Sequence, residues 1–156
     1  MMRRTIIGFL TTLFLISSGA TAEAHKRHIR HHVPSQPPIV VAHITISSQS
    51  LYLTVGGWPS GTWQVSSAGV GYHTPRGTFH VQRMARVYFS KKYDNSPMPN
   101  SLFFDGGIAM HGTYHIKSLG RPVSHGCVRL LPENAAHLYE LAEKYGPSRV
   151  QIIVTD

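Results

Sequence analysis

The sequence contains one cysteine and few acidic residues. Of its 156 residues, one is cysteine and seven are aspartate or glutamate. A single cysteine excludes an internal disulfide framework, and it also excludes the paired-cysteine zinc sites of small structural domains. Charged residues make up 14% of the chain and hydrophobic residues 42%. This composition excludes a charge-rich disordered protein and indicates one domain with a buried core.

The sequence also lacks an apolar run long enough to span a membrane. Two arginines, Arg3 and Arg4, precede an uncharged, mostly apolar run of 14 residues at positions 5–18, whereas a membrane-spanning helix needs about 20. Small residues at positions 20–24 follow and offer two A-x-A cleavage sites. We therefore expect residues 1–24 to be a signal peptide that is removed after Ala22 or Ala24. The mature protein should then lie in the periplasm or cell envelope without a stable membrane anchor.

Positive charge is in excess. The formal net charge is +8 at pH 7, so a polyanion is the expected partner. Export makes nucleic acid an unsuitable partner and leaves an acidic membrane or a cell-wall polymer. Residues 25–38 are rich in histidine, proline and basic side chains and poor in aliphatic ones, so we interpret them as a linker with no assigned metal site. Residues 39–156 then form the domain.

The domain is expected to be mainly β, with meandering antiparallel strands and one helix. Glycine and serine clusters separate short runs of β-branched and aromatic residues. The helix should begin at Pro132, where Glu133 suits the positive end, and stop at Gly146. The segment from Asp94 to Ser101 is expected to be a long loop. The predicted strands are 39–46, 51–55, 62–65, 78–84, 108–110 and 150–154.

Four side chains capable of catalysis or metal binding lie close together in the sequence: His111, His115, His125 and Cys127. Three interpretations are open from these residues alone. Cysteine acyl transfer needs a thiol nucleophile and an imidazole that moves protons, and it needs amides that hold an oxyanion. A zinc site needs three or four converging ligands, and the third interpretation is that these residues have no chemical role. Gly126 favours acyl transfer, because it allows backbone amides to face a bound carbonyl.

Several motifs in order resemble the L,D-transpeptidase catalytic domain of the YkuD type. His111-Gly112 is followed, sixteen residues after the histidine, by the cysteine of Ser-His-Gly-Cys-Val-Arg-Leu at 124–130. Thr-Pro-Arg-Gly-Thr-Phe at 74–79 is similar to another segment of that family, as are residues 119–122 and the opening strands near residues 48–52. The resemblance covers roughly residues 39–154, and it implies a β-barrel or β-sandwich in which the helix follows the catalytic cysteine.

The resemblance implies a role for each matching residue. Cys127 would attack the carbonyl of a diaminopimelate residue in a peptidoglycan tetrapeptide stem, release D-alanine and form a thioester. His111 would be its base, oriented by the backbone carbonyl of Gly112. His125 and Gly126 would shape the oxyanion pocket together with the Cys127 amide. A cysteine beside a histidine is also expected to have a depressed pKa.

Two further residues have an expected role in binding substrate. Arg129 would contact a substrate carboxylate, and Ser124 of the same motif would also contribute to binding. No metal or other cofactor is expected. Transfer to a stem-peptide amine in wall cross-linking is the leading function. Attachment of an envelope protein to peptidoglycan and L,D-carboxypeptidase hydrolysis are alternatives that use the same thioester, and a metal-binding or wall-binding module is the non-enzymatic alternative.

Overall fold

The computed structural model describes residues 37–156. The expected signal peptide and all but the last two residues of the expected linker lie outside the described residues. No helix within residues 37–156 is long and apolar enough to cross a membrane.

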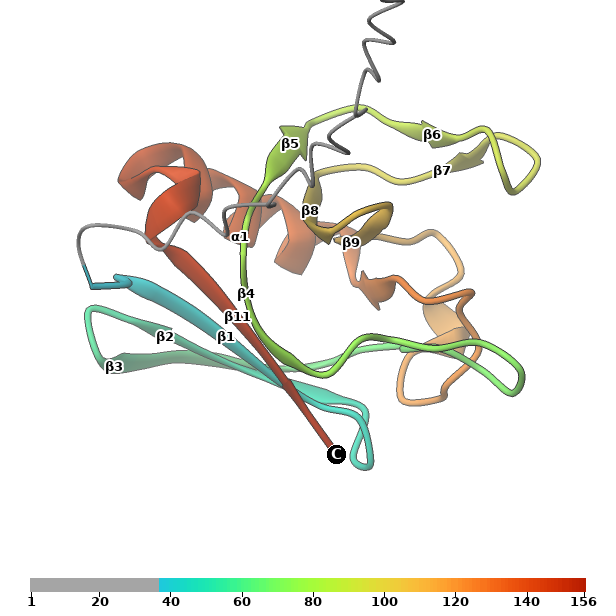
Figure 1. Cartoon of the computed structure of the whole chain (residues 1–156), viewed down its shortest axis with the longest axis horizontal. Coiled ribbons are helices and arrows are strands. Elements are labelled where there is room, and N and C mark those ends of the chain that lie inside the picture. The colour runs from blue at the N-terminus through green and yellow to red at the C-terminus, as the bar shows by residue number, and fades with distance from the viewer. Residues whose placement is uncertain (1–36) are drawn as a thin grey trace, which may run out of the picture. The chain divides into compact units, whose positions relative to one another are not determined.

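The first sheet has five strands in the order β3-β2-β1-β11-β4 (Figure 1). The first three strands along the chain form an antiparallel meander, as predicted. Gly56 and Gly57 make the turn between the second and third strands with φ values of 60° and 84°, which a tight hairpin turn requires. The strands are β1 (Val40–Thr45), β2 (Ser50–Val55), β3 (Trp58–Gln64), β4 (Gly77–His80) and β11 (Val150–Thr155).

The second sheet has four strands in the order β10-β9-β8-β5, and it carries one face of the cavity described below. The pair β9 and β10 is parallel, and so is the pair β1 and β11 of the first sheet. The described strands form open sheets rather than a closed barrel, so the sandwich alternative holds. The strands are β5 (Arg83–Ala85), β8 (Ser101–Asp105), β9 (Ile108–Gly112) and β10 (Val128–Leu130).

A short hairpin stands apart from both sheets (Figure 1). It consists of β6 (Phe89–Ser90) and β7 (Ser96–Pro97), which pair with each other. Asp94 and Asn95 form its tip with φ values of 47° and 51°, which aspartate and asparagine tolerate better than most residues. A 3₁₀ turn, η1 (Ile116–Ser118), lies between β9 and β10.

The single α-helix of residues 37–156 is the predicted one. It is α1 (Pro132–Tyr145), with Pro132 in its first turn and Glu133 at its positive end. It packs against β9, β1 and β8 through a face that buries Ala135, Leu138, Tyr139 and Ala142. Gly146 ends it with φ of 91°, and a second 3₁₀ turn, η2 (Pro147–Arg149), leads into β11.

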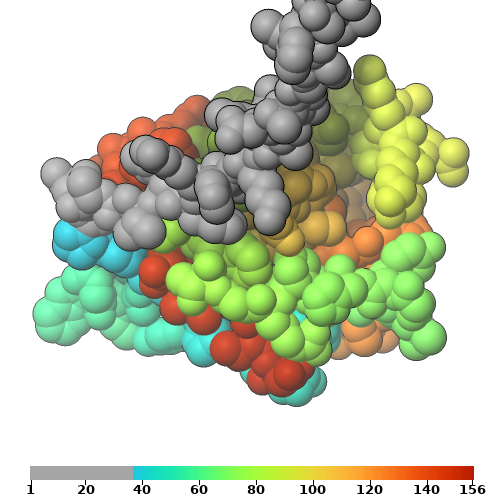
Figure 2. Space-filling view, in the orientation of Figure 1, coloured from blue at the N-terminus to red at the C-terminus, as the bar shows by residue number. Residues whose placement is uncertain are grey.

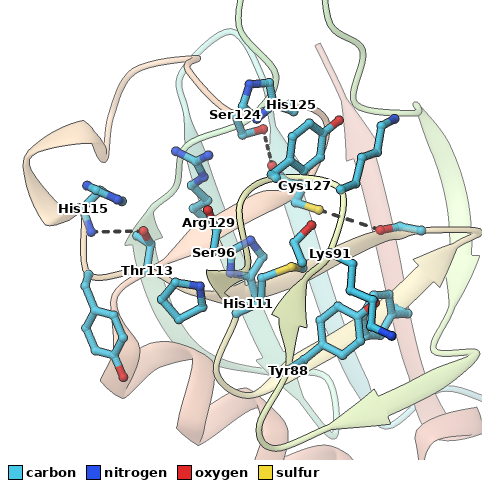
Figure 3. A pocket seen from close by; sticks show the side chains of 18 of the residues that line it. Tyr88, Lys91, Ser96, His111, Thr113, His115, Ser124, His125, Cys127 and Arg129 are labelled. Atoms are coloured by element: carbon cyan, nitrogen blue, oxygen red, sulfur yellow. Dashed lines mark hydrogen bonds between the residues drawn. The ribbon is translucent and has the colours of Figure 1, made fainter.

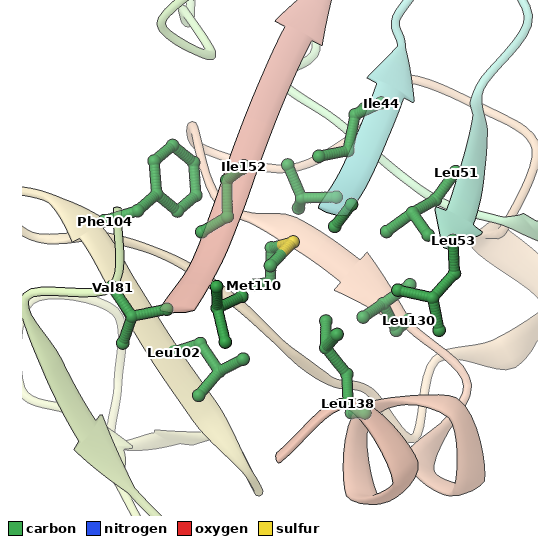
Figure 4. Packing of buried hydrophobic residues seen from close by; sticks show 14 of the residues in the cluster. Ile44, Leu51, Leu53, Val81, Leu102, Phe104, Met110, Leu130, Leu138 and Ile152 are labelled. Carbon is green, nitrogen blue, oxygen red and sulfur yellow. The ribbon is translucent and has the colours of Figure 1, made fainter. Parts of the chain in front are cut away.

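Both sheets and the helix share one apolar core (Figure 4). Ile44 and Leu53 enter it from the first sheet, Leu102 and Met110 from the second, and Leu138 from the helix, each no more than 1% exposed. Burial of such side chains contributes roughly 1.5–3 kcal/mol apiece to folding. This core fixes the second sheet in place, and with it the residues on the sheet's other face.

Two of the predicted elements need correction, and some strands were not predicted. The segment 78–84 is divided into β4 and β5, because the chain passes from one sheet to the other near the buried Val81. The predicted loop 94–101 contains β7 and the first residue of β8. Strand β8 was not predicted, because Ser101 to Phe104 are all buried and show no alternation of apolar and polar residues. Strand β10 was missed because it has only three residues.

Candidate active site

A cavity of about 640 Å³ opens on the face of the second sheet that points away from the main core. Its lining comes from that sheet, from the β6–β7 hairpin and from the segment 113–127. The hairpin, yellow in Figure 2, projects from the body on one side of this region. The cavity lining includes the four side chains that the sequence singled out for catalysis or metal binding, His111, His115, His125 and Cys127. Figure 3 draws 18 of the lining side chains and labels ten of them.

The strand register explains which residues face the cavity. Leu102, Met110 and Val128 are in adjacent pairs and point into the core. Side chains alternate between the two faces of a strand, so the residues beside them point the other way. His111 pairs with Arg129 in this cavity-facing row.

His111 is buried, with 5% of its surface exposed. Its Nδ1 atom lies 2.7 Å from the carbonyl oxygen of Gly112. A carbonyl can only accept a hydrogen bond, so Nδ1 carries the proton and Nε2 of the neutral ring is left to accept one.

The environment of His111 also keeps the ring neutral. Burial lowers the pKa of His111 to about 4, with a smaller contribution from the charge of Arg129, while the bond to Gly112 acts in the opposite direction. At neutral pH the ring is therefore uncharged and able to take a proton.

Cys127 lines the same cavity and is partly exposed. Its Sγ atom lies 3.9 Å from the carbonyl oxygen of Gly107. Burial raises the pKa of the Cys127 thiol, although a hydrogen bond from the Ala109 amide and the charge of Arg129 lower it. The expected depressed pKa is therefore wrong, because desolvation of the thiolate outweighs both favourable contacts. Before substrate binds, the pair is a neutral thiol and a neutral imidazole.

The loop that carries Cys127 is held by internal hydrogen bonds. The Ser124 hydroxyl donates to the carbonyl of Cys127 and accepts from the amide of Gly126 at 3.0 Å. Ser124 is only 1% exposed, so its hydroxyl serves the loop in this structure. Gly126 has φ of 132°, and a Cβ there would lie 2.7 Å from Ile108 Cδ1 and 3.0 Å from the carbonyl oxygen of His73. Glycine is required at this position for both reasons.

Thr74, from the Thr-Pro-Arg-Gly segment, braces the same loop. Its hydroxyl donates to the carbonyl of Gly126 at 2.8 Å and accepts from the amide of Ala68 at 3.0 Å. The side chain is 2% exposed. Sequence reasoning found the segment through resemblance but gave Thr74 no role, because its partners lie six and 52 residues away along the chain.

His125 is exposed and lies between two aromatic rings. It stacks on Tyr93 of the hairpin, with ring centroids 4.3 Å apart and planes at 10°, and meets the edge of Tyr72 at 4.5 Å. The ring therefore connects the cysteine loop to the hairpin. Tyr93 was missed by sequence reasoning, since nothing in its local sequence marks it.

Arg129 is half-buried and faces the cavity from β10. Its backbone is fixed by reciprocal hydrogen bonds with Ser66, at 2.9 and 3.0 Å. His115 also lines the cavity and is exposed. Within residues 37–156, no three histidine, cysteine, aspartate or glutamate side chains are grouped so that they could hold a metal ion.

Comparison with known proteins identifies the family. The model of the L,D-transpeptidase catalytic domain (YkuD) matches residues 39–152. Among curated proteins, none matches the chain.

Solved structures with the same fold include several L,D-transpeptidases. One from Mycobacterium tuberculosis H37Rv is 22% identical with a TM-score of 0.68, and the match covers 76% of this chain and 58% of that one. One from Mycobacterium smegmatis is 23% identical with a TM-score of 0.66, covering 76% and 59%. One from Stackebrandtia nassauensis is 24% identical with a TM-score of 0.66, covering 84% and 62%. The matched region thus spans about three-fifths of these relatives. By its match over residues 39–152, this chain belongs to the L,D-transpeptidase catalytic domain (YkuD) family.

Proposed function

We propose that this protein is a peptidoglycan L,D-transpeptidase with Cys127 as nucleophile and His111 as general base. The observation that supports this most directly is the hydrogen bond between His111 Nδ1 and the Gly112 carbonyl. It fixes the tautomer whose Nε2 can accept a proton, on a ring that lines the same cavity as the Cys127 thiol.

The first step forms a thioester. The Cys127 sulfur attacks the diaminopimelate carbonyl of a tetrapeptide stem, and its proton passes to His111 Nε2. Because the thiol is neutral at rest, this proton moves as the sulfur attacks, rather than being lost beforehand to form an ion pair. The C–N bond to D-alanine then breaks, and the imidazolium returns the proton to the departing amine.

The second step transfers the acyl group. An acceptor amine attacks the thioester carbonyl and gives a proton to His111, and the C–S bond breaks as the thiolate regains that proton. The enzyme ends as it began, with a neutral thiol and a neutral imidazole. In both steps an oxyanion forms on the substrate carbonyl.

We assign the oxyanion donor to the Cys127 amide. The Gly126 amide already donates to Ser124, so Gly126 contributes by giving the loop its backbone conformation. His125 shapes the same side of the pocket through its ring contacts. A preorganised donor of this kind is typically worth about 2.7–4 kcal/mol of transition-state stabilisation.

The proposed acceptor is the amine of a second stem peptide, which gives a cross-link between two diaminopimelate residues. Attachment of an envelope protein and hydrolysis to a tripeptide are the competing outcomes of the same thioester. The protein would meet its substrate in the cell envelope, after export directed by residues 1–24. Family members are cell-wall enzymes, which agrees with this location.

Incubation of the purified protein with tetrapeptide muropeptides tests the proposal. Mass spectrometry should detect loss of D-alanine and dimers joined through two diaminopimelate residues. Recovery of only tripeptide would indicate hydrolysis, and a reaction that begins only when an envelope protein is added would indicate protein attachment. A stoichiometric zinc ion in the purified protein, with no turnover, would instead support a metal-binding module.

A further inference from the structure

A second arginine, Arg83, faces the cavity from the opposite edge of the second sheet. Its guanidinium carbon lies 3.6 Å from the ring centroid of Phe103 and 5.1 Å from that of Tyr88. The two rings meet edge to face at 5.1 Å, and Phe103 is only 2% exposed. Because a fixed aromatic pair supports it, the guanidinium is partly preorganised even though the residue is exposed to solvent.

Arg83 and Arg129 lie on the same face, with the proposed chemistry between them. Arg83 pairs with Phe103 and Arg129 with His111, and both pairs lie on the face of the sheet that points toward the cavity. The sheet order is β10-β9-β8-β5, which places the two arginines three strands apart, about 14 Å across the sheet at the usual spacing. The register offsets them by a further two residues along the strands, because Arg83 is in the row of Ala109 and Arg129 in the row of His111. Cys127 immediately precedes β10, and its sulfur contacts Gly107, which precedes β9, and Ala109 within β9. The sulfur is therefore closer to Arg129, whose charge acts on the thiol, than it is to Arg83.

The cavity is strongly cationic. Lys91 and Lys92 of the hairpin also line it, whereas no aspartate or glutamate among the described residues does. The ion pairs within residues 37–156 are Arg76 with Asp156 and Arg86 with Glu143. Arg83 and Arg129 are therefore available to a ligand that carries negative charge.

We propose that Arg83 is a specificity-determining residue that binds the second carboxylate of the diaminopimelate side chain, while Arg129 binds the terminal carboxylate of the donor stem. This proposal rests on the proposed function. The terminal carboxylate is one residue beyond the attacked carbonyl, whereas the side-chain carboxylate lies at the end of a longer aliphatic chain. The carboxylate with the longer reach is thus matched to the more distant arginine. The enzyme should therefore prefer stems whose diaminopimelate carboxylate is free over stems in which it is amidated.

Binding to an inactive protein tests the preference without turnover. The probes are a tetrapeptide with a free diaminopimelate carboxylate and the same peptide with that carboxylate converted to the amide, titrated calorimetrically into the Cys127→Ala protein. A charged hydrogen bond of this kind is worth about tenfold or more in affinity. We expect the free acid to bind at least about tenfold more tightly. Equal affinities would overturn the proposal.

The variant Arg83→Gln identifies the residue responsible. In the Cys127→Ala background this substitution should reduce the preference for the free acid to less than about threefold, because only the binding of the free-acid peptide is weakened. Arg83→Lys should retain part of the preference. Arg86→Gln is the matched control, because Arg86 is on the adjacent chain segment, is paired with Glu143 and does not line the cavity. It should leave the preference unchanged. A preference that survives Arg83→Gln in a protein with an unchanged melting temperature would rule out Arg83.

Turnover by the intact enzyme separates this proposal from the proposed function. Preferred turnover of the free acid supports both. Equal turnover of the two peptides would leave the transpeptidase assignment standing and overturn the role of Arg83. Preferential binding of the free acid without any release of D-alanine would support the carboxylate site and contradict the proposed reaction.

Discussion

The Nδ1 atom of His111 lies 2.7 Å from the carbonyl oxygen of Gly112, the next residue in the chain. This short-range contact decides which nitrogen of a buried imidazole carries the proton. The orientation needs no acidic side chain, because a backbone acceptor is enough to fix the tautomer. The aspartates and glutamates of the described chain are all absent from the cavity lining, which agrees with this arrangement.

Replacing Cys127 by alanine should abolish thioester formation and leave the fold intact. The sulfur is partly exposed and small, so its removal creates little cavity in the core. Intact-protein mass spectrometry after incubation with tetrapeptide should show the acyl adduct on the wild-type protein only. The melting temperatures of the two proteins should agree closely. Full turnover by the alanine variant would exclude Cys127 as the nucleophile.

The two histidines near Cys127 should differ in importance. His111→Ala should lower kcat/KM by about 100- to 10,000-fold, the usual contribution of a general base. His125→Ala should have a milder effect, because that ring is exposed and contacts Tyr93 and Tyr72 rather than a backbone acceptor that would orient it for catalysis. D-Alanine release measures both variants. The reverse order of effects would transfer the role of base to His125.

The enzymatic activity should fall in acid, because a protonated His111 can no longer act as the base. Burial lowers the pKa of His111 to about 4, so kcat/KM for a donor peptide should fall as the pH drops below about 5 and His111 becomes protonated. Above about pH 5 His111 is already neutral, so its titration causes no further change in kcat/KM. A fall in kcat/KM centred near pH 6.5, the ordinary pKa of histidine, would show that the ring is solvated in the free enzyme and would contradict the buried arrangement.

The same shift predicts a loss of stability in acid. The folded protein holds His111 at a pKa of about 4, below the value near 6.5 in the unfolded chain, so the unfolded state binds more protons between these values. The free energy of unfolding should be unaffected by this group above pH 6.5 and should fall by roughly 3 kcal/mol on reaching pH 4. Urea denaturation at pH 7.5 and pH 4 measures the fall, and His111→Gln should show a smaller one. An identical pH dependence in the variant would refute the assignment to His111.

Thr74 should affect both stability and catalysis through the loop that carries Cys127. Thr74→Val keeps the shape of the side chain but leaves the Gly126 carbonyl and the Ala68 amide without this partner. The expected cost is roughly 1–3 kcal/mol of unfolding free energy, together with a loss of kcat as the loop moves. Thr74→Ser is the matched control, because it retains the hydroxyl, and it should remain close to the wild type. Chemical denaturation and D-alanine release measure the two effects. If Thr74→Val matched the wild type in both unfolding free energy and D-alanine release, the hydrogen bonds of Thr74 would contribute nothing to the stability or the activity.

The sequence determined those features that depend on local chemistry. The periodic apolar residues, the proline and the glycine were sufficient to place α1 over Pro132–Tyr145. The alternating runs and the paired glycines predicted the β1–β3 meander, because strand alternation and turn geometry involve neighbouring residues. The motifs that contain His111, Gly126 and Cys127 predicted the family by their resemblance to it, because their order and spacing are properties of the sequence itself.

Only the tertiary structure decided the features that depend on residues distant in sequence. Strand β8 is buried on both faces, because the main core lies on one side and Phe103 packs with Met98 and Ala109 in a second apolar cluster on the other, so its sequence carries no alternation. The pKa of Cys127 was predicted in the wrong direction, because the cost of burying a thiolate depends on everything packed around it. Arg83 and Arg129 are 46 residues apart in the chain, and they share one face of the sheet because strand pairing, rather than sequence, makes them neighbours of the same cavity.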